Sequence, residues 1–375
     1  MTGVVPLTGP ALARTRRPLR VVEIADSRFP IAEPFAGGMQ SLTWHLIRGL
    51  ADRGVELSVY AGPGSDPRLR ATTLATAPLE LSDTARQDVA MQPESWLREH
   101  HAYLQMMLDL ARRSDVDVVH NNSLHHLPVA MAESLPAPVV TTLHTPPTPW
   151  LEPAVRLSSP AHSRYVAVSH HTARQWAHVA QASVIPNGVD AARWPAGDGG
   201  PDLVWVGRIA PEKAPHLAVD IARVAGRRLR LAGPVSDPTY WREQLRPRLG
   251  EDVTYVGHLG QRDLAALVGS SALCLVTPLW DEPYGLVAAE ALSCGTPVLA
   301  LARGGVPEVV ADSCARLVAP GPAGTVVAQA AALVPEAAAL DRRAARAHAL
   351  EHCSLDRMVE SYLELFDLAR GSLAA

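Results

Sequence analysis

Short apolar runs alternate with amphipathic stretches along the first half of the chain. The runs are apolar almost throughout, which is typical of strands buried on both faces of a parallel sheet. Strands are predicted at residues 20–24, 55–62, 115–122, 138–144 and 165–169. Apolar residues at helical spacing predict helices between them, at residues 39–53, 94–113 and 170–179. This alternation indicates consecutive βαβ units and therefore an α/β domain.

The same alternation restarts after an Asn-Gly turn at residues 187–188. Residues 203–226 have the pattern of strand, loop and helix. Further strands are predicted at residues 228–234, 253–259, 272–278 and 297–301, followed by an alanine-rich helix at 325–350 and an amphipathic helix at 355–370. A chain of 375 residues is long for one domain. We therefore predict two doubly wound domains, residues 1–190 and 191–354, with the boundary near Asp190.

Two segments lack this periodicity. Residues 1–19 are expected to be disordered, and residues 63–92 are expected to form a long surface loop. The arginine cluster before the first strand is interpreted as a solvated arm; it consists of Arg14, Arg16, Arg17 and Arg20.

Charge and composition exclude several classes of protein. The sequence has 34 basic and 38 acidic residues, a net charge of -4, and no basic stripe that would indicate nucleic-acid binding. No apolar run approaches the length of a membrane span, and the N-terminus lacks the pattern of a secretion signal. A cytoplasmic protein without membrane association is expected, and its oligomeric state stays open.

Cysteine and histidine spacing predicts no metal site. The cysteines are not arranged as CxxC and are expected to be buried thiols; they are Cys274, Cys294, Cys314 and Cys353. The adjacent pairs His125–His126 and His170–His171 lack further ligands at helical or hairpin spacing.

The stretch WDEPYGLVAAEALSCGTP at residues 280–297 carries the strongest chemical pattern. It lies between two predicted strands and contains a short predicted helix that starts near Gly285 and ends at the capping position of Gly295. Amides at a helix start have no intrahelical partner and carry partial positive charge, so they bind phosphate or electron-rich oxygens. Glu282 precedes this helix and can reach sugar hydroxyls. Glu290, about two turns further on, can accept from a more distant hydroxyl pair.

Two other segments carry groups suited to a diphosphate. Arg208 and Lys213 lie in a predicted strand-to-helix loop, where an arginine fork and a lysine point charge would neutralise phosphates. Gly37 and Gly38 open the first predicted helix, where a glycine pair allows either close approach to a phosphate or only a tight turn. The first βαβ unit lacks G-x-G-x-x-G, which weakens a dinucleotide oxidoreductase hypothesis. His144 ends a predicted strand, at the edge where open α/β sheets bind ligands.

Four segments together resemble the retaining GT-B glycosyltransferases of family GT4. They are EPYGLVAAEALSCGTPVLA at residues 282–300, GRIAPEKA at 207–214, IPNGVD at 185–190 and TLHTPP at 142–147. The resemblance covers nearly the whole chain and is strongest from residue 184 to 310. Ala214 stands where the family usually has glycine, a departure expected to change the loop geometry slightly while keeping the charges of Arg208 and Lys213. Residues 311–318 lack the usual glycines, so the turn there is expected to differ.

The resemblance implies a GT-B fold, in which two Rossmann-like domains face each other across a cleft and the closing helix at 355–375 packs back on the first domain. It implies a retaining glycosyltransferase that uses a nucleoside-diphosphate sugar, with a UDP-sugar as the expected donor. The family chemistry is same-face attack, in which the leaving diphosphate takes the acceptor proton. Electrostatic stabilisation of that diphosphate would be the main catalytic effect, and no metal or other cofactor is expected.

Roles for individual residues also follow from the resemblance. Arg208 and Lys213 would contact the diphosphate, and Glu290 would contact the ribose. The expected catalytic residues are Glu282, His144, Arg208 and Lys213. The other expected donor-binding residues are Gly37, Gly38, His258, Tyr284, Gly285, Leu286 and Glu290; the first two lie against the diphosphate, and the backbone around His258 reads the base.

The first domain is expected to bind the acceptor through loops at 25–36, 62–92, 122–127 and 145–160. These loops offer hydrogen-bonding groups and one flat apolar face; the candidates are Asp26, Glu33, Asn121, Asn122 and Trp150. No stretch pairs a basic face with exposed apolar side chains as a membrane-surface helix does. We therefore expect a small hydroxylated acceptor such as a sugar, an aminocyclitol or a natural-product intermediate. The alternatives are a GT-B-like NDP-sugar epimerase and a non-catalytic nucleotide-sugar-binding protein, neither of which would require an acceptor.

Overall fold

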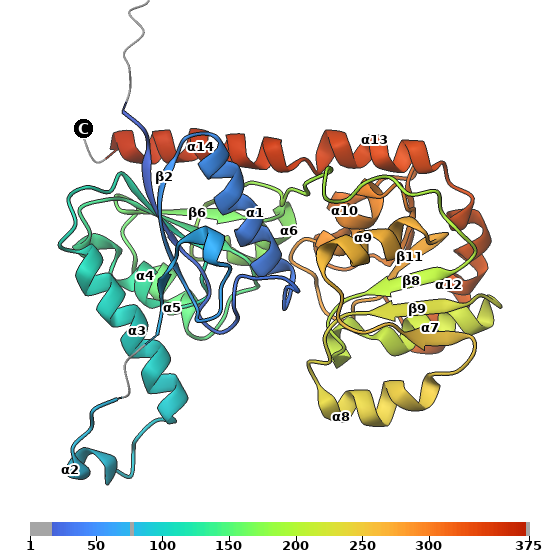
Figure 1. The fold of residues 1–375 in the computed structure, drawn as a ribbon, viewed down its shortest axis with the longest axis horizontal. Coiled ribbons are helices and arrows are strands. Elements are labelled where there is room, and N and C mark those ends of the chain that lie inside the picture. Colours follow the sequence, from blue (N-terminus) through green and yellow to red (C-terminus); the bar gives the residue numbers. More distant parts are fainter. Residues whose placement is uncertain (1–16, 76–78, 373–375) are drawn as a thin grey trace, which may run out of the picture.

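The computed structural model describes residues 17–75 and 79–372, which form two α/β halves, each built on a parallel sheet (Figure 1). The first sheet has seven strands in the order β3-β2-β1-β4-β5-β6-β7. Its strands are β1 (Arg20–Ile24), β2 (Glu56–Ala61), β3 (Thr72–Thr73), β4 (Val118–Asn121), β5 (Val139–Leu143), β6 (Ser163–Ala167) and β7 (Ala182–Val184). Its helices are α1 (Gly38–Asp52), α2 (Asp83–Arg86), α3 (Glu94–Leu110), α4 (Leu127–Ala130), α5 (Leu151–Leu157) and α6 (His170–Trp176).

The second sheet has six strands in the order β10-β9-β8-β11-β12-β13. They are β8 (Leu203–Val206), β9 (Leu229–Ala232), β10 (Val253–Tyr255), β11 (Leu273–Val276), β12 (Val298–Leu301) and β13 (Ala315–Val318). Its helices are α7 (Pro215–Val224), α8 (Pro238–Tyr240), α9 (Gln261–Gly269), α10 (Leu286–Ser293), α11 (Val306–Val309), α12 (Ala323–Ala338) and α13 (Arg342–His352). The last helix, α14 (Leu355–Ser372), follows them in the chain.

In both sheets the strand order reverses beside the first strand in sequence. β1 lies between β2 and β4, and β8 lies between β9 and β11. Such a reversal leaves a crevice at the carboxyl ends of the strands, where doubly wound sheets bind ligands. The predicted α/β class with two Rossmann-like domains is confirmed.

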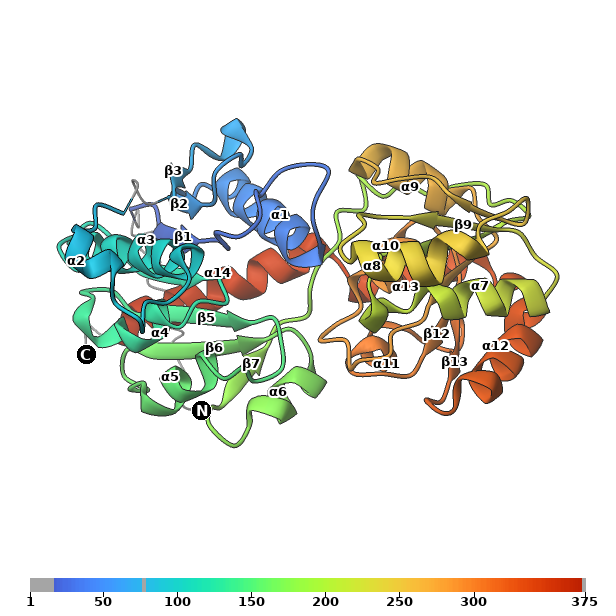
Figure 2. The same cartoon turned by 90° about the horizontal axis from the view of Figure 1, so that it is seen from below.

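The C-terminal helix α14 belongs to the core of the first half of the chain (Figure 2). Its buried side chains Val359, Tyr362 and Phe366 pack with Val21 of β1 and Leu42 of α1. The two helices approach closely, since a Cβ atom at Gly49 of α1 would lie 2.7 Å from Val359 Cγ2. α14 thus covers the first sheet although its first residue, Leu355, comes 171 positions after Val184, the end of β7.

The chain passes between the two halves twice, and both passages lie side by side. Val189 forms a parallel bridge with Ser354, in which Val189 N donates to Cys353 O at 2.7 Å and Leu355 N donates to Val189 O at 3.2 Å. A Cβ atom at Gly188 would lie 2.5 Å from Leu355 Cα, so only glycine fits there. Asp190 follows this bridge directly.

The structure differs from the sequence-based predictions in three segments. The alanine-rich stretch predicted as one helix is two, α12 and α13, bent by 97°. The break follows from Asp341, whose carboxylate accepts from Arg343 N at 2.9 Å and starts a new helix. Residues 63–92 are not only loop: Thr72 and Thr73 pair with β2, and α2 is helical.

At the N-terminus, residues 17–19 are ordered, contrary to the prediction. The Arg17 guanidinium pairs with the Asp117 carboxylate, so this arginine is not simply solvated. The rest of the segment predicted to be disordered, including Arg14 and Arg16, lies outside the described residues.

None of the helices in the described part of the chain is by itself long and apolar enough to cross a membrane; only α12 with α13, as a bent pair, meets that test by length and composition.

Candidate active site

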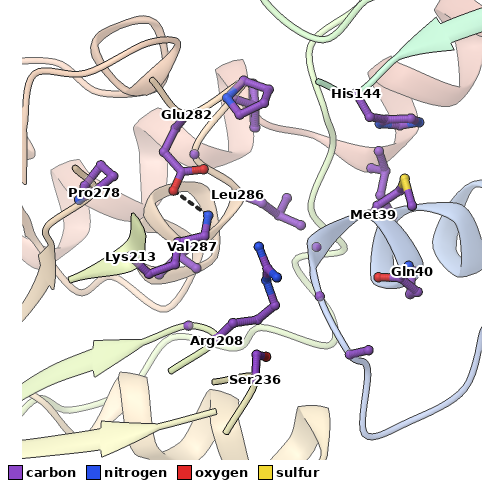
Figure 3. A pocket seen from close by; sticks show the side chains of 18 of the residues that line it. Met39, Gln40, His144, Arg208, Lys213, Ser236, Pro278, Glu282, Leu286 and Val287 are labelled. Carbon is purple, nitrogen blue, oxygen red and sulfur yellow. Dashed lines mark hydrogen bonds and ion pairs between the residues drawn. The ribbon is translucent and has the colours of Figure 1, made fainter. Parts of the chain in front are cut away.

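A cavity of about 740 Å³ lies between the two halves, at the carboxyl ends of their strands (Figure 3). One wall comes from the loops after β8 and β11 and from the start of α10. The opposite wall comes from the start of α1 and the end of β5. The wall from the second half includes Arg208, Lys213, Ser236, Trp280, Glu282, Gly285 and Leu286. The wall from the first half includes Asp26, Gly37, Gly38, Met39, Gln40 and His144. Most of the predicted donor-site residues thus lie together.

Both cations on the wall from the second half are paired with carboxylates. Lys213 Nζ lies 2.5 Å from Glu282 Oε1, and Arg208 donates to Glu212 Oε1 at 3.0 Å. Lys213 also lies 5.0 Å from the ring centroid of Trp280, within reach of a cation–π interaction. The cations are therefore held at the rim of one space, where both can reach an anion.

Lys213 is the one lysine in the sequence, whereas the other 33 of the 34 basic residues are arginine. The residue after it, Ala214, is buried and has a left-handed backbone (φ 47°). This conformation is strained for alanine and free of strain for glycine. Because Ala214 still adopts this left-handed conformation, the replacement of glycine by alanine leaves the loop conformation in place.

The start of α10 supplies the amides expected for a phosphate or sugar site. Gly285 has φ 106°, which brings the chain from Glu282 into the helix, and a Cβ atom there would lie 3.1 Å from Val306 Cγ2. The first amides of the helix have no intrahelical partner and point toward the helix start. Glu282, Lys213 and these amides thus surround one position.

Glu290 lies in the middle of α10 and lines a second cavity of about 160 Å³. This smaller cavity shares Gly37, Gly38 and Arg208 with the first. The Glu290 side chain is buried, and burial raises its pKa to about 8. Its carboxyl group has no hydrogen-bond partner among the described residues. A buried acceptor without a partner is costly, and ligand hydroxyls would supply what it lacks.

The pKa of Glu290 predicts how stability depends on pH. Because the pKa of Glu290 in the folded protein exceeds its usual value of 4.5, the protonated group favours the folded state. This contribution to the free energy of unfolding is fully present below pH 4.5 and is lost as the pH rises toward 8. Glu290→Gln should therefore gain stability relative to wild type as pH rises through this window, by up to about 1.4 kcal/mol per pH unit. Urea denaturation of both proteins between pH 5 and pH 8 measures the difference in their free energies of unfolding. The contributions of all other titrating groups are common to both proteins and cancel in this difference. A constant difference would contradict the assignment.

Two residues of the first half form the opposite wall near α10. A Cβ atom at Gly38 would lie 3.2 Å from Leu286 Cδ2, so the glycine permits this close approach across the cavity. His144 follows β5 and is nearly enclosed; burial is the main cause of its lowered pKa, about 3, so its ring is neutral at pH 7. Its Nε2 atom hydrogen-bonds Asn122 Oδ1 at 2.8 Å.

The candidate acceptor residues do not lie together. Asp26 lines the cavity, and burial raises the pKa of its carboxyl group. Glu33 instead pairs with Arg193 and accepts from Gln261 N at 3.1 Å, which joins the two halves of the chain. Asn121 and Asn122 are buried, and their amides bond to neighbouring side chains.

Trp150 is 61% exposed and lies beside Trp96, outside the cavity lining. Tyr284 lines the cavity but is buried in the core with Cys353. His258 donates from Nε2 to Phe35 O at 2.9 Å and lines the smaller cavity. Two cavity residues that were not predicted from the sequence are Met39 and Gln40; their place directly after the glycine pair was the available signal.

Sequence comparisons assign this arrangement to a family. The family model described as Glycosyltransferase Family 4 matches residues 36–193, and the one described as glycosyl transferases group 1 matches residues 200–335. This chain belongs to glycosyltransferase family 4. The enzyme is thus a glycosyltransferase that uses nucleoside-diphosphate sugar donors, and this assignment is favoured over the epimerase and the non-catalytic binding protein.

Several characterised proteins resemble this family 4 glycosyltransferase over most of its length. The glycogen synthase of Mycobacterium tuberculosis (strain H37Rv) is 28% identical over 357 residues, covering 82% of this chain and 85% of the relative. The D-inositol 3-phosphate glycosyltransferase of Mycolicibacterium paratuberculosis is 29% identical, covering 90% and 87%.

Solved structures share the fold of this family 4 enzyme. AviGT4, a glycosyltransferase involved in avilamycin A biosynthesis, superimposes with a TM-score of 0.69 at 24% identity, covering 94% of this chain and 98% of AviGT4. Anabaena HepE, solved in complex with UDP-glucose, has a TM-score of 0.70 at 16% identity, covering 93% and 99%. Both likenesses confirm the predicted GT-B architecture.

Proposed function

We propose that this enzyme transfers a sugar, with retention of configuration, from a UDP-sugar to a small hydroxylated acceptor. The observation that carries the proposal is the convergence of Arg208, Lys213, Glu282 and the start of α10 on one cavity. Two cations and free amides suit a diphosphate, and a carboxylate beside them suits sugar hydroxyls. UDP as the nucleotide is supported by HepE, whose structure was solved with UDP-glucose.

In this mechanism the acceptor hydroxyl oxygen attacks the anomeric carbon while the bond from that carbon to the diphosphate oxygen breaks. The leaving diphosphate oxygen takes the hydroxyl proton, so charges and atoms balance without an enzyme nucleophile. Arg208, Lys213 and the α10 amides stabilise the negative charge that develops on the diphosphate. Glu282 orients the sugar during transfer.

The proposed acceptor is a sugar, a cyclitol or a related polyol. Support comes from the hydrogen-bonding groups at the cavity wall, Asp26 and Gln40, and from the names of two relatives, a glycogen synthase and a D-inositol 3-phosphate glycosyltransferase. A lipid acceptor is the competing choice. Transfer assays with water-soluble polyols and with anionic liposomes separate the two; transfer to lipid alone would overturn the proposal.

The donor is identified by thermal shift with UDP-, GDP- and ADP-sugars, because a ligand that binds only the folded state raises its melting temperature. Proton NMR of the product formed from an α-linked UDP-sugar then reads the configuration of the new bond. An α-linked product supports retention, and a β-linked product contradicts it. Release of UDP only in the presence of an acceptor supports the transferase.

Metal independence is expected from the two cations at the diphosphate position. Excess EDTA should leave the transfer rate unchanged, because Arg208 and Lys213 supply the positive charge that a divalent ion would otherwise provide. The same assay with added Mg²⁺ or Mn²⁺ is the control. A rate that collapses in EDTA and recovers with either metal would show that the diphosphate is held differently.

A further inference from the structure

Polar side chains continue from His144 into the interior of the first half, where a parallel sheet is normally apolar. Strand register places Glu23 of β1 beside His120 of β4. Strand alternation puts His120 and Asn122, and likewise Thr142 and His144, on one face. α14 covers this face. Glu23, His120 and Thr142 are fully buried, and Asn122 is 1% exposed. Burying such groups is costly unless each is hydrogen-bonded.

Each of these side chains does have a partner. Glu23 Oε2 lies 2.8 Å from His120 Nδ1, and Glu23 Oε1 accepts from Asn122 Nδ2. Asn122 Oδ1 lies 2.8 Å from His144 Nε2. On the other side, His120 Nε2 lies 2.9 Å from Thr142 Oγ1, which lies 2.9 Å from the Tyr362 hydroxyl of α14. One branch therefore leads to the active-site cavity and the other to the C-terminal helix.

The chemistry of the first branch fixes where the proton of His144 sits. A carboxylate only accepts hydrogen bonds, so Glu23 selects the NH₂ end of the Asn122 amide and turns its oxygen toward His144. An amide oxygen also only accepts, so His144 Nε2 must carry a proton. Since the ring is neutral, Nδ1 has none. In the described part of the chain, Nδ1 of His144 has no hydrogen-bond partner.

We infer that Glu23 and Asn122 are positioning residues that hold His144 as its Nε2–H tautomer, so that the lone pair of Nδ1 is left for a hydroxyl of the bound donor sugar. His144 Nε2–H donates to Asn122 Oδ1, so toward the sugar the ring accepts a hydrogen bond and does not donate one. It therefore favours a hydroxyl at that point of the sugar and gives no hydrogen bond to a phosphate or carbonyl oxygen. The identity of the hydroxyl rests on the proposed function, whereas the tautomer is a property of the free enzyme.

The tautomer is measured directly on the unliganded protein. Long-range ¹H–¹⁵N correlation of ¹⁵N-histidine-labelled enzyme distinguishes a protonated ring nitrogen from an unprotonated one, and comparison with His144→Ala identifies the signals. The expected spectrum shows His144 with a protonated Nε2 and an unprotonated Nδ1. A proton on Nδ1, or a mixture of both forms, would overturn the inference. This result requires no turnover and no ligand, so it stands apart from the proposed function.

Two variants test the positioning role. Asn122→Ala and Glu23→Leu, which remove the amide and its acceptor, should both leave His144 as a mixture of tautomers. Tyr362→Phe is the matched control: it removes a buried hydroxyl from the other branch and should keep the wild-type tautomer. If Asn122→Ala retained the pure Nε2–H form, the positioning role would be wrong.

Kinetics then distinguish a loss of His144 positioning from a general perturbation of the structure. Asn122→Ala should lower kcat/KM for the donor by about 10-fold or more, with the acceptor KM little changed. In a His144→Ala background the same change should have almost no further effect, because its action passes through His144. Additive losses would instead indicate a structural role only.

Discussion

Lys213→Ala should lower kcat/KM for the donor by about 30- to 1,000-fold, which corresponds to about 2–4 kcal/mol of transition-state stabilisation. Lys213 and Arg208 lie in one loop at the cavity, so each should be needed where negative charge develops on the leaving diphosphate. Arg208→Ala should show a loss of the same order. Steady-state kinetics with varied donor at saturating acceptor measures both.

The control is Arg242→Ala, which removes an exposed cation that pairs with Glu243 outside the cavity. It should leave kcat/KM unchanged. Near-normal turnover in Lys213→Ala and Arg208→Ala would show that the diphosphate lies elsewhere.

The presence of a single lysine offers a second, independent measurement. Acetylation of amines should inactivate the enzyme, and UDP should protect it, because the only reactive side-chain amine belongs to Lys213. Intact mass before and after modification counts the acetyl groups. The α-amino group is the other site, and peptide mapping distinguishes the two.

Glu282→Ala should lower kcat by about 100-fold or more, while the affinity for free UDP stays the same or rises. Glu282 lies beside the expected position of the transferred sugar and, without ligand, pairs with Lys213. Its loss removes a sugar contact and frees the lysine for the diphosphate. Single-turnover kinetics and calorimetric titration with UDP separate the two effects.

Glu290→Ala provides the contrast to Glu282→Ala. Its carboxyl group lines the smaller cavity, so its loss should weaken UDP binding, by about 10-fold, with a smaller effect on kcat once donor is saturating. An equal loss of UDP affinity in the two variants would contradict the division of roles between the two carboxylates.

The sequence predicted that these residues of the second half lie together, because they share one simple placement. Arg208, Lys213 and Glu282 all follow parallel strands, and parallel strands end at the same edge of a sheet. The strand-to-helix pattern around each of them is strong enough to locate this edge without any knowledge of distant contacts.

The arrangement of the candidate residues in the first half was harder to predict, because polar residues at a strand end can face either way. Asn122 directly follows β4, yet it points into the interior, where Glu23 and His144 engage it. The signal for this was Glu23, a carboxylate in the middle of a short apolar strand, which needs buried partners. Which strand supplies them depends on register and on the packing of α14, and neither can be read from local pattern.

The break between α12 and α13 was missed for a different reason. Alanine favours helix on both sides of the break, so composition gives one continuous helix. The competing factor is the Arg342 guanidinium, which donates to carbonyl oxygens of three separate segments, those of Gly197, Gly269 and Cys294. These tertiary contacts fix the direction in which α13 starts.

The paired crossings at Val189 and Ser354 have a consequence for dissecting the protein. A fragment that ends near Asp190 would lack α14 and would expose the apolar face of the first sheet that this helix covers. Because the two crossings are hydrogen-bonded neighbours, a few flexible residues could replace 191–353 and rejoin the chain directly to α14. The second half is one uninterrupted segment of the chain, so it could be exchanged between relatives by a cassette insertion at this single junction.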